Sequence, residues 1–247
     1  MWFIPYVRVR RAVTIYALFL IGVVGVAVAL RYWPGVIQID GRHQSILAAA
    51  RIDVSMLLAG SAALVGGLAT VLGLNLAAEN DGHLELAWTK PVSREGYALG
   101  VFAVDIAAMA ACILLTAAGG GVVYDVYVGH QAIGQGDVSA LWSGLACCGF
   151  PLCIYAWITA LSASVKRNRG TVAGLFWPLM IALAALEAIR IPAVHAVATA
   201  LNSVNPIELY FTASSGSQPA IATYLWGWAI GAVLLAAALV QWRRLEI

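Results

Sequence analysis

Long runs of apolar residues constrain this chain more than any other feature. Six of them are long enough to cross the hydrocarbon core of a bilayer, which takes about 20 helical residues. They cover residues 12–32, 54–77, 97–123, 139–165, 171–189 and 221–242. Only 11% of the residues are charged, roughly half the share found in an ordinary soluble domain. The sequence therefore predicts an all-α polytopic membrane protein with six transmembrane helices, forming one transmembrane domain over residues 1–247.

Positively charged side chains are divided unequally between the segments that connect these runs. If the N-terminus is cytoplasmic, the cytoplasmic segments hold Arg8, Arg10, Arg11, Lys90, Arg94, Lys166, Arg167, Arg169, Arg243 and Arg244. The outer segments then hold only Arg31, Arg42, Arg51 and Arg190. Positive charges next to transmembrane helices are retained in the cytoplasm. We therefore expect both termini, and the 79–94 segment between the second and third runs, to be cytoplasmic, with the chain in the cell membrane (plasma or inner).

Motifs for catalysis and for nucleotide binding are missing from the sequence. It has no G-x-x-x-x-G-K-[ST] phosphate loop and no H-E-x-x-H zinc motif. All four histidines fall outside the apolar runs, so an intramembrane nucleophile would lack a partnered base. The net charge of +2 and the lack of a basic stripe argue against nucleic acid as a partner. We expect no catalytic residue, no metal site and no cofactor bound by this chain itself.

The four cysteines, Cys112, Cys147, Cys148 and Cys153, all lie within the third and fourth runs. Disulfide frameworks belong to loops in an oxidising compartment. Cysteines inside helices are better interpreted as small, polarizable packing residues.

Asp105 is the one acidic residue near the middle of an apolar run. An unpaired carboxylate in hydrocarbon costs several kcal/mol, on the order of 3, so Asp105 should face protein or water. In a structural interpretation, the carboxyl is protonated or hydrogen-bonded to a neighbouring helix. In a functional interpretation, it lies on a substrate pathway or in a polar lock that changes between conformations. The structural interpretation is favoured, because buried acids with satisfied partners are common in helix bundles.

Small residues recur along the second run in two series, Ala59-Ala63-Gly67 and Ala62-Gly66-Thr70. Each has the small-xxx-small spacing that lets another helix approach closely. The neighbour is either a helix of the same subunit or one that slides against this helix along a central pathway.

The 79–94 segment is a dense polar stretch between two apolar runs. Its candidate partner-contact residues are Glu79, Asp81, Gly82, Leu84, Glu85, Pro91, Ser93 and Arg94. The three acidic side chains can face a basic groove on a partner, with Leu84 adding an apolar contact. Gly82 lets the chain turn or approach closely. Pro91 ends the segment, Ser93 can cap the third helix, and Arg94 can reach lipid phosphates.

Gly-x-Leu-Glu followed by Pro-Val-Ser-Arg at this spacing resembles the cytoplasmic coupling segment of type-2 ABC transporter permeases. The resemblance implies a short coupling helix between the second and third spans that touches a separate ATP-binding subunit. It implies two copies of that subunit, which would hold ATP and Mg, and a second permease subunit, either identical or related. The chain would then be the membrane-spanning permease of an ATP-driven exporter.

The stretch between the last two runs is too long for a tight turn. Residues 193–201 are helical in composition, Asn205-Pro206 breaks that helix, and residues 214–217 form a flexible exit. This pattern is similar to the external re-entrant hairpin that the same family has between its last two spans.

A secondary transporter or channel is the alternative, with Asp105 coupling the movement of ions or protons. Such proteins are commonly built from internal repeats with broken helices at matching positions. No convincing repeat is visible in this sequence.

Overall fold

The computed structural model describes residues 3–32, 52–79, 93–128, 133–134, 138–163, 165, 169–189, 191–215 and 220–244. Within these ranges the chain is helical, apart from a two-residue parallel pairing of β1 (Ile52–Asp53) with β2 (Ile133–Gly134). Five stretches are long and apolar enough to cross a membrane: Val9–Leu30, Val54–Ala78, Glu95–Val126, Leu141–Ser162 and Ala222–Arg244. The prediction of a helical chain with several membrane-spanning helices is confirmed at this level.

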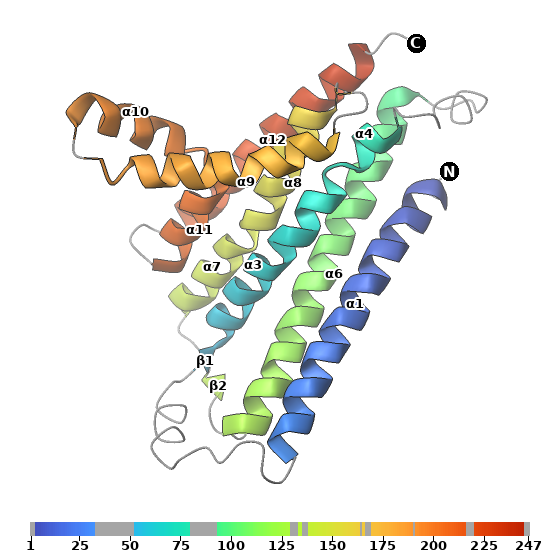
Figure 1. Ribbon diagram of the computed structural model, residues 1–247, viewed down its shortest axis with the longest axis vertical. Helices are drawn as coiled ribbons and strands as arrows, with labels where there is room; N and C mark the ends of the chain where they lie inside the picture. The colour runs from blue at the N-terminus through green and yellow to red at the C-terminus, as the bar shows by residue number, and fades with distance from the viewer. Residues whose placement is uncertain are drawn as a thin grey trace.

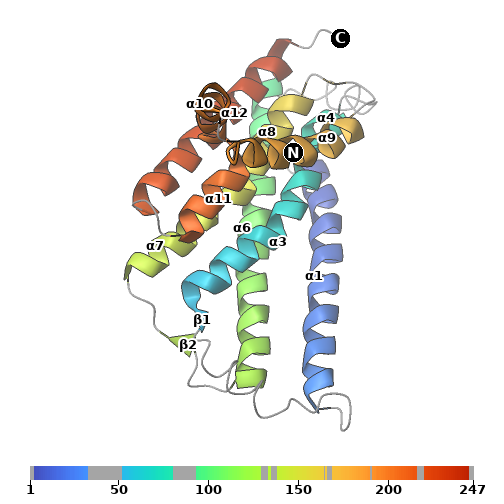
Figure 2. The same cartoon turned by 60° about the vertical axis from the view of Figure 1, so that its left-hand side comes forward.

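The described part of the chain begins and ends at the same end of the bundle. The helices are α1 (Phe3–Tyr32), α3 (Val54–Leu72), α4 (Asn75–Glu79), α6 (Arg94–Val128), α7 (Val138–Cys147), α8 (Gly149–Ser162), α9 (Arg169–Leu186), α10 (Pro192–Asn202), α11 (Pro206–Ser215) and α12 (Ala220–Arg244). In Figures 1 and 2, α1 and α6 run side by side, and β1 and β2 lie at the opposite end from both termini. The end of α4 and the start of α6 share the end that holds the termini (Figure 1).

Two of the predicted spans are each divided into two helices. The second is interrupted at Gly73-Leu74, between α3 and α4, and the fourth at Cys148, between α7 and α8. Pro151 lies in the first turn of α8, and its ring nitrogen has no hydrogen to donate to the carbonyl of Cys147. Proline thus accounts for the second interruption.

The predicted fifth span differs from the expectation. Most of residues 171–189 form α9, whose apolar stretch covers only Gly170–Leu186. That is shorter than the roughly 20 residues that a typical crossing requires. α9 also contains Pro178 and runs crosswise to the long helices in both views (Figures 1 and 2). In the described part of the chain, five of the six expected spans are long and apolar enough to cross a membrane, and two of those five are interrupted.

Two short helices occupy the stretch predicted to form a hairpin. α10 covers the predicted helical residues 193–201 and ends before Asn205-Pro206, as expected. The second short helix, α11, was not predicted. Pro206 follows the end of α10 and is also the first residue of α11. Proline is favourable at the first position of a helix, where its missing N–H would have no intrahelical partner. The side chain of Asn205 caps this helix, with its Oδ1 accepting a hydrogen bond of 3.1 Å from the N–H of Ile207.

α8 forms the centre of the bundle and is buried along almost its whole length. It packs against α3 on one side and α12 on the other. The helices approach closely through glycine: a Cβ on Gly66 would lie 2.8 Å from the ring of Phe150, and one on Gly144 would lie 2.8 Å from the Cα of Ser55. The Ala62-Gly66-Thr70 series is therefore a packing face within the subunit. Gly67, in the other series, has open space where a Cβ would lie.

Candidate functional site

Asp105 is fully buried and bonded to two other helices. Its Oδ1 accepts a hydrogen bond of 2.9 Å from Nδ2 of Asn75, the first residue of α4. Its Oδ2 accepts one of 2.9 Å from the hydroxyl of Tyr155 on α8. The carboxyl therefore links three helices, and the hydrogen-bonded form of the structural interpretation is confirmed.

The partners of Asp105 were not identified from the sequence. Asn75 and Tyr155 are 30 and 50 residues away from it along the chain. Their polarity could have indicated them, because Asn75 and Tyr155, like Asp105, are hydrogen-bonding side chains within apolar runs. The edge of Phe102 meets the ring of Tyr155 at a centroid distance of 6.3 Å and an interplanar angle of 87°. This packing fixes the tyrosine, and so the direction of its hydroxyl.

The interruption between α3 and α4 sets the position of Asn75. The carbonyl of Gly73 accepts hydrogen bonds of 3.3 Å from two hydroxyls of α8, those of Thr159 and Ser162. A Cβ on Gly73 would lie 2.9 Å from the Cβ of Ile158, so only glycine permits this approach without a shift. The hydroxyls replace part of the helical bonding lost at the break, which must be satisfied when no water is present. The chain can therefore turn here and direct Asn75 toward Asp105.

An apolar groove of about 810 Å³ runs between α1 and α3 and reaches the same cluster. Its lining is mainly aliphatic and aromatic, with Arg11 and Asn75 among its polar members. Asn75 therefore both lines this groove and donates to Asp105. Gly67 and Leu68 of α3 also line it. Gly67, the last residue of the Ala59-Ala63-Gly67 series, therefore borders this groove.

Most of the predicted ATPase-contact residues lie outside the described residues. These are Asp81, Gly82, Leu84, Glu85 and Pro91. Glu79 is the last residue of α4, and Arg94 is the first of α6. The Oγ of Ser93 accepts a hydrogen bond of 3.1 Å from the N–H of Gly96. The prediction that Ser93 caps the third long helix is confirmed.

One ion pair joins the start of α6 to the end of α12 at this end of the bundle. Nε of Arg243 lies 3.3 Å from Oε1 of Glu95, and both side chains are largely exposed. An exposed pair of this kind contributes little to stability, since solvent screens it. The pair does show that the end of α12 lies beside the start of α6, the helix that follows the 79–94 segment.

The cysteines behave as packing residues. All four are free thiols, and Cys112, Cys147 and Cys153 are buried. The thiol of Cys153 on α8 lies 3.3 Å from the carbonyl oxygen of Gly227 on α12 and donates to it. The expectation of buried packing cysteines is confirmed for these three.

Comparison of the chain with protein-family models, with curated proteins and with solved structures gave no match. The functional interpretation therefore rests on the residues and geometry of this chain.

Proposed function

We propose that this chain is the membrane-spanning permease subunit of an ATP-driven exporter of the ABC type. The observation that carries the proposal is the bond between the two helices that flank the 79–94 segment. The helix entering the segment begins at Asn75, the helix leaving it carries Asp105, and these two side chains are hydrogen-bonded at 2.9 Å. A push on the segment by an ATP-binding subunit would act on both partners of this buried bond. Tyr155 would carry the movement onward to α8 at the centre of the bundle.

A count of crossings supports the six-span arrangement. The start of α1 and the end of α12 lie at the same end of the bundle (Figure 1), as an even number of crossings would place them. Five spanning helices leave one crossing to be supplied. We infer that α9 and α11 share that crossing, with α10 turning back between them. In this arrangement α10 and α11 belong to the fifth crossing, whereas the family that the 79–94 segment resembles has its hairpin between the fifth and sixth spans.

The assembly follows from the same resemblance. Two permease subunits, identical or related, would pair in the cell membrane, and two ATP-binding subunits would dock at the 79–94 segments on the cytoplasmic side. ATP and Mg would bind to those subunits. The apolar groove beside Asn75 supports an apolar or amphipathic cargo, because ligand pockets match the polarity of what they hold. Ion coupling through Asp105 is less well supported, since its carboxyl is completely buried and held by donors from two other helices.

The experiment is purification of the tagged full-length chain from the membranes of its own cells. We expect a protein with a phosphate-loop sequence to co-purify and the complex to hydrolyse ATP. Glu85→Lys should reduce recovery of that protein about tenfold, because it places a like charge against a basic groove. Asp137→Lys, in a loop that we expect on the outer side, is the matched charge-reversal control and should leave recovery unchanged.

Two results would overturn the proposal. One is binding of ATP by the pure chain after the partner has been removed. The other is normal assembly and transport in the Glu85→Lys variant.

A further inference from the structure

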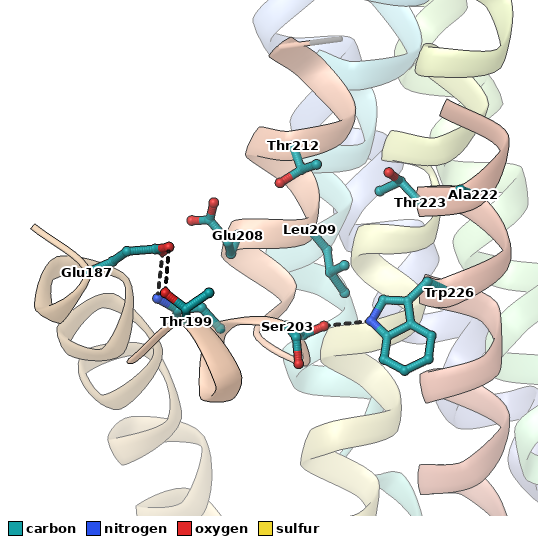
Figure 3. Close-up of a pocket in the computed structure, with 10 residues that line it drawn as sticks. Glu187, Thr199, Ser203, Glu208, Leu209, Thr212, Ala222, Thr223 and Trp226 are labelled. Carbon is teal, nitrogen blue, oxygen red and sulfur yellow. Dashed lines mark hydrogen bonds between the residues drawn. The ribbon is translucent and has the colours of Figure 1, made fainter. Parts of the chain in front are cut away.

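A second cavity, of about 520 Å³, lies between the α10–α11 pair and α12. Figure 3 shows its walls, which are formed by Glu187, Thr199, Asn202, Ser203, Glu208, Leu209, Thr212, Ala222, Thr223 and Trp226. Its volume is within the range of small-molecule pockets, about 300–1,000 Å³. Among the described residues, the lining is rich in hydroxyls and contains two carboxylates and no basic side chain. The charge of the wall therefore favours a cation.

One carboxylate is held rigidly at the wall. Glu187 follows the end of α9, and its two oxygens accept hydrogen bonds from α10: 3.0 Å from Nδ2 of Asn202 and 3.3 Å from Oγ1 of Thr199 (Figure 3). Asn202 is buried, and it also donates 3.1 Å to the carbonyl of Leu183. The negative charge is therefore fixed in position before any ligand arrives.

The second carboxylate, Glu208 on α11, has no hydrogen-bond or ion-pair partner among the described residues. Glu187 and Glu208 line the same cavity, and like charges in one site repel each other. A cation placed between them would relieve that repulsion.

The hydroxyl of a largely buried threonine, open to the cavity, independently points to a polar ligand. Thr223 on α12 is only 7% exposed, and its hydroxyl makes no hydrogen bond within the described part of the chain. In Figure 3 its oxygen is turned into the cavity, on the side of Thr212 and Glu208. Because the hydroxyl opens onto the cavity, a partner for it can come from what the cavity holds. A ligand with its own hydrogen-bonding group would supply one.

The remaining walls indicate the size and character of the ligand. Nε1 of Trp226 donates 2.7 Å to the carbonyl of Ser203, which fixes the indole beside the cavity, with Leu209 and Ala222 as further apolar lining. Indole faces attract organic cations. A bare metal ion fits less well, because no cluster of three or more His, Cys, Asp or Glu side chains occurs among the described residues.

We propose that this cavity binds an organic amine, with ammonium groups at Glu187 and Glu208, a hydrogen bond to Thr223 and the carbon chain against Trp226. The inference concerns binding to this chain itself and does not depend on the proposed coupling to ATP. A diamine suits the two carboxylates better than a monoamine, because each charge then has a partner.

The experiment is isothermal titration calorimetry on the purified full-length chain in lipid nanodiscs, with 1,4-diaminobutane as the probe. Its neutral counterpart, 1,4-butanediol, has the same length and keeps hydroxyl donors. We expect the diamine to bind at least about tenfold more tightly than the diol, because only the diamine makes charge-assisted hydrogen bonds. Absence of diamine binding, or equal affinity for both compounds, would overturn the proposal.

Variants distinguish this cavity from general attraction of cations to the protein. Glu208→Gln keeps the shape of the side chain and breaks no hydrogen bond among the described residues, so it should fold normally and weaken diamine binding about tenfold. Thr223→Val should weaken it about fivefold through loss of the hydroxyl. Glu95→Gln, at the other end of the bundle, is the matched control and should bind as the unaltered chain does. Equal weakening by Glu95→Gln and Glu208→Gln, or tight Ca²⁺ binding that depends on Glu208 and excludes the diamine, would contradict the assignment.

Discussion

The hydroxyl of Tyr155 on α8 donates a hydrogen bond of 2.9 Å to Oδ2 of Asp105 on α6, and both side chains are buried. The other oxygen of Asp105 is occupied by Asn75. Each carboxylate oxygen therefore has one donor from a different helix. Asp105 therefore joins α4, α6 and α8 through hydrogen bonds, and substitutions at each of these residues test that role.

Asp105→Asn should fold and change stability by only about 1 kcal/mol. The new amide oxygen can accept from Asn75, and the new NH₂ can donate to the hydroxyl of Tyr155, which also accepts hydrogen bonds. Asp105→Leu leaves both partners without an acceptor and should cost about 3 kcal/mol or more. Thermal unfolding in the same detergent compares the two variants. A folded Asp105→Asn protein that has lost transport would show that the charge of Asp105 matters more than its hydrogen bonds.

Tyr155→Phe should destabilise the chain by roughly 1–2 kcal/mol, because Oδ2 of Asp105 loses its donor while remaining buried. Tyr224→Phe is the matched control, since the hydroxyl of Tyr224 makes no hydrogen bond among the described residues. A double-mutant cycle with Asp105→Leu, which removes the acceptor, should give a coupling energy of about 0.5–3 kcal/mol. Additive effects of the two substitutions would mean that the pair contributes nothing.

Gly144→Ala should destabilise the protein by about 1–3 kcal/mol, because overpacking forces backbone shifts. Its methyl group would lie 2.8 Å from the Cα of Ser55, which is main chain and cannot rotate away. Gly67→Ala has open space for the same methyl group and should be neutral or stabilising by up to about 1 kcal/mol, through better helix propensity. Unfolding temperatures of the two variants, measured side by side, decide the point. Equal effects would contradict the close contact between α3 and α7.

His83→Cys tests the sidedness of the 79–94 segment. We expect a membrane-impermeant maleimide to label it only after the cells are opened, because the positive charges around this segment keep it in the cytoplasm. Gln135→Cys, in a loop that we expect on the other side, should be labelled in intact cells. The background should be low, since Cys112, Cys147 and Cys153 are buried. Labelling of His83→Cys from outside would reverse the assigned orientation.

The helical class and the positions of most spans could be predicted from the sequence. The run at 12–32 lies within α1, the run at 97–123 within α6, and the run at 221–242 within α12. Apolar length determines these helices because hydrocarbon offers the backbone no other hydrogen-bond partner. The cap at Ser93 was predictable for a related reason, since its hydroxyl satisfies an N–H of its own helix a few residues later.

The interruptions at Gly73-Leu74 and Cys148, and the crosswise direction of α9, could not be predicted in the same way. Composition alone does not distinguish α9 from a spanning helix, because its residues are as apolar as those of its neighbours. Its direction depends on contacts with residues distant in sequence, such as the hydrogen bond of 3.1 Å from Nε1 of Trp177 to Oγ1 of Thr70 on α3. The turn at Gly73 likewise requires two hydroxyls of α8.

The sequence by itself determined that this chain is helical, where its apolar helices lie, and that Asp105 must have a partner. Only the tertiary structure decided that Asn75 and Tyr155 are those partners, and that Glu187, Glu208 and Thr223 line one cavity. Hydrophobic length and helix capping act between residues close together along the chain, so a linear pattern records them. Hydrogen bonds and cavities between helices depend on which faces meet, and packing of the whole bundle sets that choice.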